Sequence, residues 1–180
     1  MRLLLRLAGL VLLAFAALVL YGRERAWERV GPSDLGRVSF DALVRSPAPN
    51  DALLATPALG LNADAPLPLY RATPEAVMAA IDAVIAREGA QVVEAGPTLR
   101  RVVTRSPLMR FPDTTTIEAV PVEGGAANGG GTALRAYARA TVGRSDFGAN
   151  ARRLRDWLGA LPLERAPTPP ERIGPRGAGQ

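Results

Sequence analysis

Four short stretches suited to β-strands follow one another between two segments of helical periodicity, and this order restricts the fold more than any other feature. The stretches alternate apolar and polar residues or are rich in valine and threonine, as β-strands are. They cover residues 90–95, 98–105, 114–122 and 132–142. Because three short connections join them, we expect an antiparallel meander. In the last stretch Arg135, Tyr137 and Arg139 share one face, which is typical of a half-buried strand.

Amphipathic helices are predicted on both sides of this run. The first begins with Thr73 as N-cap and Pro74 at the first helical position, and Gly89 ends it. Its apolar stripe consists of Val77, Ile81, Val84 and Ile85. The second helix follows a glycine-containing segment at 143–148. Its apolar seam consists of Phe147, Ala151, Leu154, Leu158 and Leu161.

The predicted fold class is therefore α+β, in the order α-β-β-β-β-α over residues 72–161. Two amphipathic helices suffice to cover one face of a four-stranded antiparallel sheet, which makes a two-layer sandwich. Residues 23–71 are proline-rich without a sustained period and predict an irregular arm or linker. Residues 162–180 have the composition of a disordered tail.

The first 22 residues are predicted to be a transmembrane anchor or a signal sequence. Arg2 and Arg6 precede an uncharged run from Leu7 to Tyr21, and the apolar character extends to roughly the ~20 residues of a spanning helix. A cleaved signal peptide is the alternative, but no A-x-A spacing follows the run. Arginines flank both ends, so charge does not fix the orientation. The basic start is typical of export and favours the periplasmic side of a bacterial inner membrane.

The composition excludes several kinds of chemistry. The 180-residue chain has no Cys, His or Lys, and all 22 of its basic residues are Arg. It therefore lacks a thiolate nucleophile, an imidazole base, a lysine Schiff base and the usual ligands of zinc. We expect no cofactor and no metal.

The charge balance restricts the partners. From Gly22 onward 20 Arg stand against 17 acidic residues, a net charge of +3. This excess is too small to indicate nucleic-acid binding, but an anionic surface remains a possible partner. One face of the predicted sheet carries four arginines, which we expect to be solvated or to meet anionic headgroups. They are Arg101, Arg105, Arg135 and Arg139.

Two polar segments contain the candidate ligand-binding residues: SPLMRFPD at 106–113 and VGRSDFGANARRLRDW at 142–157. The candidates are Arg110, Asp113, Arg144, Ser145, Asp146, Asn150 and Arg153. In the structural interpretation Ser145 caps the second helix and Asp146 complements its dipole. Asn150 then holds an irregular segment such as the proline-rich arm at 46–57, and Arg110 pairs with Asp113 or Asp146. In the functional interpretation the backbone N–H groups and Arg144 form an anion pocket.

The same two segments resemble the domain-of-unknown-function 1499 family of bacteria and photosynthetic organisms. The resemblance lies in Arg110-Phe111-Pro112-Asp113 and in a Gly-x-Ser-Asp-x-Gly-x-Asn-x-x-Arg block. This block maps onto Gly143, Ser145, Asp146, Gly148, Asn150 and Arg153. The resemblance covers roughly residues 45–161 and implies no activity.

Together these observations favour a membrane-anchored, non-enzymatic envelope domain that binds a protein or an anionic lipid. One alternative is an enzyme with a site of carboxylates and arginines at Arg110, Asp113, Arg144 and Asp146. Such a site requires both aspartates and an arginine around an open cleft. A purely structural envelope component is the other alternative.

Overall fold

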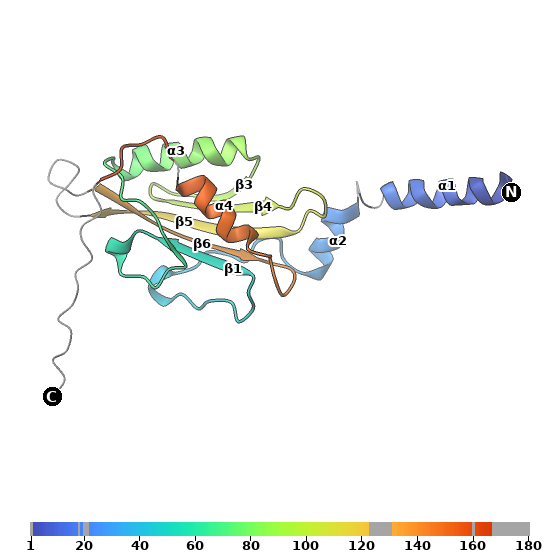
Figure 1. The fold of residues 1–180 in the computed structure, drawn as a ribbon, viewed down its shortest axis with the longest axis horizontal. Helices are drawn as coiled ribbons and strands as arrows, with labels where there is room; N and C mark the ends of the chain where they lie inside the picture. Colours follow the sequence, from blue (N-terminus) through green and yellow to red (C-terminus); the bar gives the residue numbers. More distant parts are fainter. Residues whose placement is uncertain (1, 18, 20–21, 123–130, 160, 167–180) are drawn as a thin grey trace, which may run out of the picture.

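The computed structural model describes residues 2–17, 19, 22–122, 131–159 and 161–166, and its centre is a six-stranded mixed sheet (Figure 1). The strand order is β2-β1-β6-β5-β4-β3. The strands are β1 (Asp51–Ala55), β2 (Ala65–Pro66), β3 (Gln91–Ala95), β4 (Leu99–Arg105), β5 (Pro112–Val122) and β6 (Gly131–Ala140). The α-helices are α1 (Arg2–Ala17), α2 (Arg23–Val30), α3 (Pro74–Arg87) and α4 (Ala149–Leu158). Two 3₁₀ turns, η2 (Phe40–Ala42) and η3 (Pro57–Leu59), lie before and after β1.

The four strands expected from the sequence, β3 to β6, pair antiparallel in chain order. The prediction of a four-stranded sheet is nevertheless wrong, because the proline-rich segment adds two strands. β1 pairs antiparallel with β6, and the two-residue β2 pairs parallel with β1. Residues 52–55 of β1 are all buried, so the strand lacks the alternation that marks a half-exposed strand.

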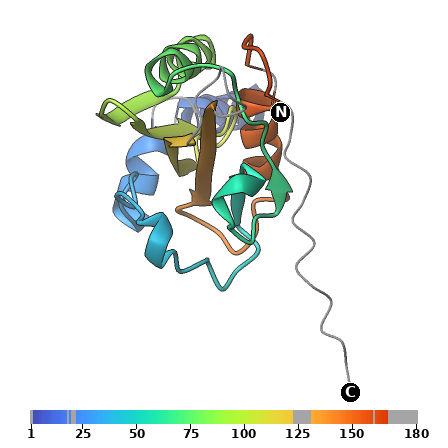
Figure 2. The same ribbon diagram turned by 90° about the vertical axis from the view of Figure 1, so that its left-hand side faces the viewer.

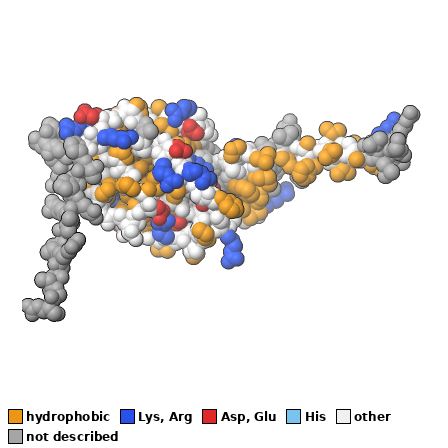
Figure 3. All heavy atoms as spheres, in the orientation of Figure 1, with side chains coloured by type: hydrophobic (Ala, Val, Ile, Leu, Met, Phe, Trp, Pro, Cys, Tyr) orange, Lys and Arg blue, Asp and Glu red, His pale blue; other side chains and the backbone are white. Residues whose placement is uncertain are grey.

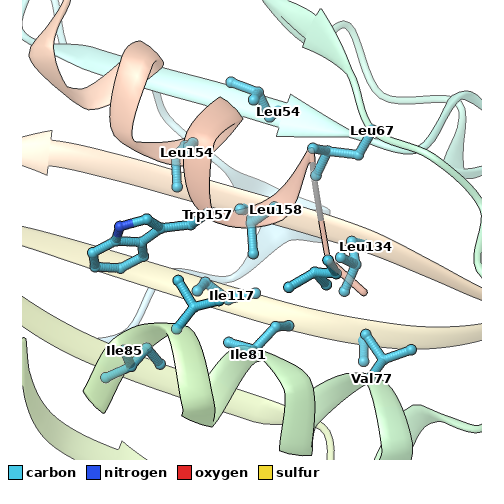
Figure 4. Close-up of a cluster of buried hydrophobic side chains, with 14 of the residues drawn as sticks. Leu54, Leu67, Val77, Ile81, Ile85, Ile117, Leu134, Leu154, Trp157 and Leu158 are labelled. Carbon is cyan, nitrogen blue, oxygen red and sulfur yellow. The ribbon is translucent and has the colours of Figure 1, made fainter. Parts of the chain in front are cut away.

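Helices α3 and α4 cover one face of the sheet, and the main core lies between them and the strands (Figure 4). The side chain of Thr73 accepts a hydrogen bond from Ala76 N at 3.3 Å, which confirms the predicted N-cap of α3. The predicted stripe of α3 is buried as expected. Buried residues of α4 are Asn150, Leu154, Trp157 and Leu158. Phe147 does not belong to this seam, since it precedes α4 and is 86% exposed.

A segment of residues 31–43, which we call the strap, covers the other face of the sheet (Figure 2). Phe40 of the strap is buried with Leu53 and Tyr137, and Leu35 N donates to Thr114 Oγ1. The protein therefore has three layers where two were predicted. The sequence pattern of the strap is irregular because it packs through single side chains rather than through a periodic face.

Helix α1 projects from one end of the domain, followed by α2 (Figure 1). The prediction of an N-terminal transmembrane helix is corrected: among the residues that the structure describes, no helix is both long and apolar enough to cross a membrane. α1 has 16 residues, against the roughly 20 of a spanning helix. The next helix, α2, begins with Arg-Glu-Arg.

The residues after α4 return to the domain. Arg165 forms a β-bridge with Tyr70, and the buried Ala166 packs with Leu69 and Ala133. Most of the predicted tail, residues 167–180, lies outside the described residues, as do residues 123–130 between β5 and β6.

Candidate functional site

Three loops meet at one end of the sheet, which we call the loop end. They span residues 44–50, 106–111 and 141–148. The antiparallel register explains their meeting, since Asp113 at the start of β5 pairs with Ala140 at the end of β6. Asp51 at the start of β1 pairs with Arg139. Helix α2 contacts this end, where the ring centroids of Trp27 and Phe111 lie 4.5 Å apart.

All seven candidate residues lie at or beside the loop end, although they come from β5, α4 and two of the loops. The core of the group is an ion pair between α4 and β5. Arg153 Nη2 donates to Asp113 Oδ2 at 2.9 Å, and Arg153 Nη1 donates to Asn150 Oδ1 at 2.8 Å. Burial raises the pKa of Asp113 above its ordinary value against the opposing effect of Arg153, and the nearby charge of Asp146 raises it further.

The sequence predicts that Arg110 pairs with Asp113 or Asp146, and the contacts described for these two carboxylates involve other groups. Asp113 binds Arg153, and Asp146 binds backbone N–H groups. Arg110 instead occupies a left-handed backbone conformation (φ 58°), and its N–H donates to Ser106 O at 3.0 Å. Arg153 on α4 reaches Asp113 at the start of β5, a contact between residues 40 positions apart in the sequence.

The turn at 143–148 leads into α4. Ser145 and Asp146 both bind backbone N–H groups there, but their roles differ from the prediction. Asp146 Oδ1 accepts from Gly148 N and its Oδ2 accepts from Asn150 N, both at 2.9 Å. Ser145 Oγ accepts only from Phe147 N, at 3.2 Å, before the helix begins. Asp146 is therefore the residue that binds the first turn, and Ser145 shapes the turn.

This arrangement leaves little support for the anion pocket proposed at the helix start. The backbone N–H groups of Phe147, Gly148 and Asn150 already donate to Ser145 and Asp146. A fixed carboxylate occupies the position where an anion would bind. Arg144 lies beside the turn with an exposed side chain.

Asn150 is fully buried and holds the proline-rich loop, as expected. Its Nδ2 donates to Asn50 O at 3.4 Å. Asn50 completes the attachment, because its own Nδ2 donates to Gly143 O at 2.8 Å and its Oδ1 accepts from Ser46 Oγ at 2.6 Å. Asn50 was not among the candidates. Its position in the proline-rich arm at 46–57, which Asn150 was expected to hold, is the signal that could have identified it.

A second cluster that the sequence did not reveal surrounds Asp51. Its carboxylate accepts from Arg45, from Ser46 N and from Tyr137 OH at 2.7 Å. Burial opposes ionisation, but these hydrogen bonds prevail and lower the pKa of Asp51. Burial and the bond to Asp51 raise the pKa of Tyr137 to about 12. Arg45 also binds Asp64, so the cluster ties the loop before β1 to the chain before β2.

Three of the four arginines expected on an open face of the sheet bind residues of the strap. Arg101 pairs with Asp34 and Glu94, and Arg135 binds Asp41 and Glu118 and lies over the ring of Phe40. Arg105 donates to Ser33 Oγ, and Arg139 is half-buried. Arg101, Arg105 and Arg135 hold the strap, and the prediction of a solvated face is wrong for these three because residues of the irregular segment bind them.

Two hollows lie away from the loop turns. One of about 360 Å³ lies between the strap and Arg135, and one of about 330 Å³ lies between α3 and α4. Arg153 lines the second hollow, but Asp113 and Asp146 do not. Within the described ranges no group of three or more acidic residues is arranged to hold a metal ion. Neither of these two hollows is therefore the open cleft around two aspartates that the carboxylate and arginine enzyme requires.

The loop end also exposes large apolar side chains. Leu108 and Met109 on the β4–β5 turn are 68% and 41% exposed, and Phe147 on the β6–α4 turn is 86% exposed. Hydrophobic side chains continue along α1 (Figure 3). These residues were not candidates in the sequence analysis, where Phe147 was assigned to the core.

Comparison with known proteins identifies the family and gives no activity. No curated protein and no solved structure matches this chain. The family model described as "Protein of unknown function (DUF1499)" matches residues 47–161, which is more than half of the chain and includes all seven candidate residues. The chain therefore belongs to the domain-of-unknown-function 1499 family.

Proposed function

We propose that this protein is a non-enzymatic module that binds a lipid surface through its loop end. The observation that carries the proposal is the exposure of Leu108, Met109 and Phe147 on two separate turns at one end of the sheet. Exposed apolar residues scattered singly are normal on soluble proteins, whereas several at one place mark an interaction site. Most of the polar candidates support this function indirectly: Asp113, Asn150 and Arg153 bind one another, and Ser145 and Asp146 bind the backbone.

The backbone conformation of both turns supports the proposal that they hold their apolar side chains outward in fixed positions. Phe147 has a left-handed conformation (φ 53°), as does Arg110 (φ 58°). For residues other than glycine this conformation costs about 1 kcal/mol or more and persists only where the surroundings impose it. Ser145 and Asp146 hold the Phe147 turn, and Ser106 and Trp27 hold the other. Rigid presentation of an apolar side chain reduces the entropy lost on docking.

Helix α1 extends from the same end and adds apolar surface. Its exposed large residues are Leu7, Leu10, Val11, Leu12, Leu13 and Phe15. In water such a surface is unfavourable by about 25 cal/mol per Å² relative to an apolar environment. A lipid interface buries it without requiring a groove of matching shape. The proposal places α1 in the interface and does not require a helix that crosses the bilayer.

The absence of cysteine from the chain gives a direct test. Single-cysteine variants Leu108→Cys and Phe147→Cys of the full chain, labelled with an environment-sensitive fluorophore, are mixed with phosphatidylcholine vesicles with and without phosphatidylglycerol. The matched control is Val92→Cys, because Val92 is exposed on the edge strand β3.

We expect the emission of the probes at positions 108 and 147 to shift to shorter wavelength with vesicles, and the probe at position 92 to remain unchanged. This readout separates docking of the loop end from binding by α1 alone. If the chain sediments with vesicles but the two loop probes do not respond, the loop end is not the docking surface. If the chain binds no vesicle, the proposed function is wrong, and a protein partner becomes the better explanation.

A further inference from the structure

Exposed arginine side chains lie on α2, which contacts the loop end through Trp27, and on the β6–α4 turn. Arg25 and Arg29 are exposed on α2, and Arg144 is exposed on the β6–α4 turn. In the part of the chain that the structure describes, none of these three forms an ion pair with a carboxylate. The arginines on the sheet face behave differently, since Arg101 and Arg135 are bound by acidic partners.

The acidic residues whose side chains are described on α2 and in the 141–148 turn are Glu28 and Asp146. Glu28 is exposed on α2 between the two arginines. Asp146 is the nearest carboxylate to Arg144 along the chain, and both of its oxygens accept backbone hydrogen bonds. The loop end therefore combines exposed apolar side chains with a local excess of positive charge.

We infer that the surface this end binds is an anionic lipid membrane, in which the three arginines meet phosphate groups while Leu108 and Phe147 enter the apolar layer. The inference rests on the proposed function and names its partner. A guanidinium matches phosphate oxygens with two parallel hydrogen bonds, which a point charge does not. The described hollows lie elsewhere, along the strap and between α3 and α4. An end with protruding side chains suits an extended, deformable surface better than an enclosed ligand.

The size of the expected preference follows from the charge. Each arginine close to an anionic membrane strengthens binding by roughly fivefold. Three such residues, partly offset by Glu28, are expected to give a preference of about 10- to 100-fold for anionic over neutral vesicles. Because the contacts are exposed, salt screens them, and the preference decreases as ionic strength rises.

The test compares binding of the full chain to vesicles of phosphatidylcholine alone and to vesicles that contain phosphatidylglycerol. The test variant combines Arg25→Gln, Arg29→Gln and Arg144→Gln. The control removes three exposed arginines at other places, with Arg87→Gln, Arg155→Gln and Arg165→Gln, so that the net charge changes equally. We expect the test variant to lose the preference for anionic vesicles and the control to keep most of it.

The outcomes separate this inference from the function on which it rests. Equal binding of the unmodified chain to neutral and anionic vesicles overturns the inference and leaves lipid binding in place. A preference that survives in the test variant, or that the control loses equally, also overturns it, because net charge would then act without these three residues. Failure to bind any vesicle overturns both proposals.

Discussion

Replacing Asn150 with alanine tests the claim that the polar residues of the loop end stabilise the fold through their contacts with one another. Asn150 is 0% exposed and accepts a hydrogen bond from Arg153 Nη1 at 2.8 Å. A hydrogen bond to a charged group contributes about 1.5–3 kcal/mol. The unfilled volume of the amide costs about 1 kcal/mol more, and the higher helix propensity of alanine offsets about 0.5 kcal/mol. We expect Asn150→Ala to lower the free energy of unfolding by about 2–3 kcal/mol.

Urea unfolding followed by tryptophan fluorescence measures this change, because Trp157 is buried on the same helix. With a denaturant slope of about 2 kcal/mol per M, the midpoint falls by about 1–1.5 M. Arg155→Ala is the matched control, since Arg155 is exposed on α4 and also becomes alanine. If Asn150→Ala lies within about 0.5 kcal/mol of this control, the reasoning is refuted.

A double-mutant cycle assigns the loss to the correct contact. The variants are Asn150→Ala, Arg153→Met and their combination, measured in the same urea assay. If the bond between the two side chains is responsible, the double variant costs less than the two single variants together, by about 1 kcal/mol or more. A coupling energy near zero indicates that Asn150 acts only by filling space.

Three further predictions concern the contacts that hold the fold. In thermal unfolding followed by circular dichroism, Asp146→Ala is expected to lower the free energy of unfolding by about 1–2 kcal/mol and Ser145→Ala by less than about 0.5 kcal/mol. The reason is that only Asp146 binds the first turn of α4. Equal losses contradict this assignment. Gly131→Ala places a Cβ 2.2 Å from Tyr70 O and should cost about 2–4 kcal/mol in urea; an unchanged midpoint contradicts the close approach. The pKa of Tyr137 is raised to about 12, so its contribution to stability, about 2 kcal/mol, is complete below pH ~10 and is lost as pH rises through ~12. Tyr137→Phe should flatten this alkaline loss in stability measured against pH, and an identical profile contradicts it.

Local patterns in the sequence predicted the elements whose burial is periodic. The stripe of α3 repeats at helical spacing, and Thr73 and Pro74 mark its start, so both appear as expected in the structure. The meander of β3 to β6 follows from short connections and β-branched residues. β1 was missed because residues 52–55 are buried on both faces, and β2 because two residues carry no pattern.

The candidate site shows the same division between local and distant contacts. The turn bonded by Ser145 and Asp146 joins neighbours in the chain, so the polar sequence indicated it, although not which residue binds the helix. The partner of Asp113 lies 40 positions away on α4. Spacing alone does not distinguish Arg153 from Arg110 as that partner. The strap was missed for a related reason, since it binds through single acidic residues such as Asp34.

The polar contacts that hold the start of α4 and the proposed docking surface meet in one short turn, residues 143–148. Asp146 binds the N–H groups on the C-terminal side of Phe147, so it fixes both the start of α4 and the backbone that carries this aromatic ring outward. Weakening these contacts should therefore reduce lipid binding even where no exposed side chain is changed, because a mobile turn loses more conformational entropy on docking. Asp146→Ala should lower the affinity for neutral phosphatidylcholine vesicles several-fold at a temperature where the fold is intact, since the lost carboxylate charge has no effect on that surface. Replacement of Asp82 on α3, distant from the loop end, serves as the control for a general loss of stability.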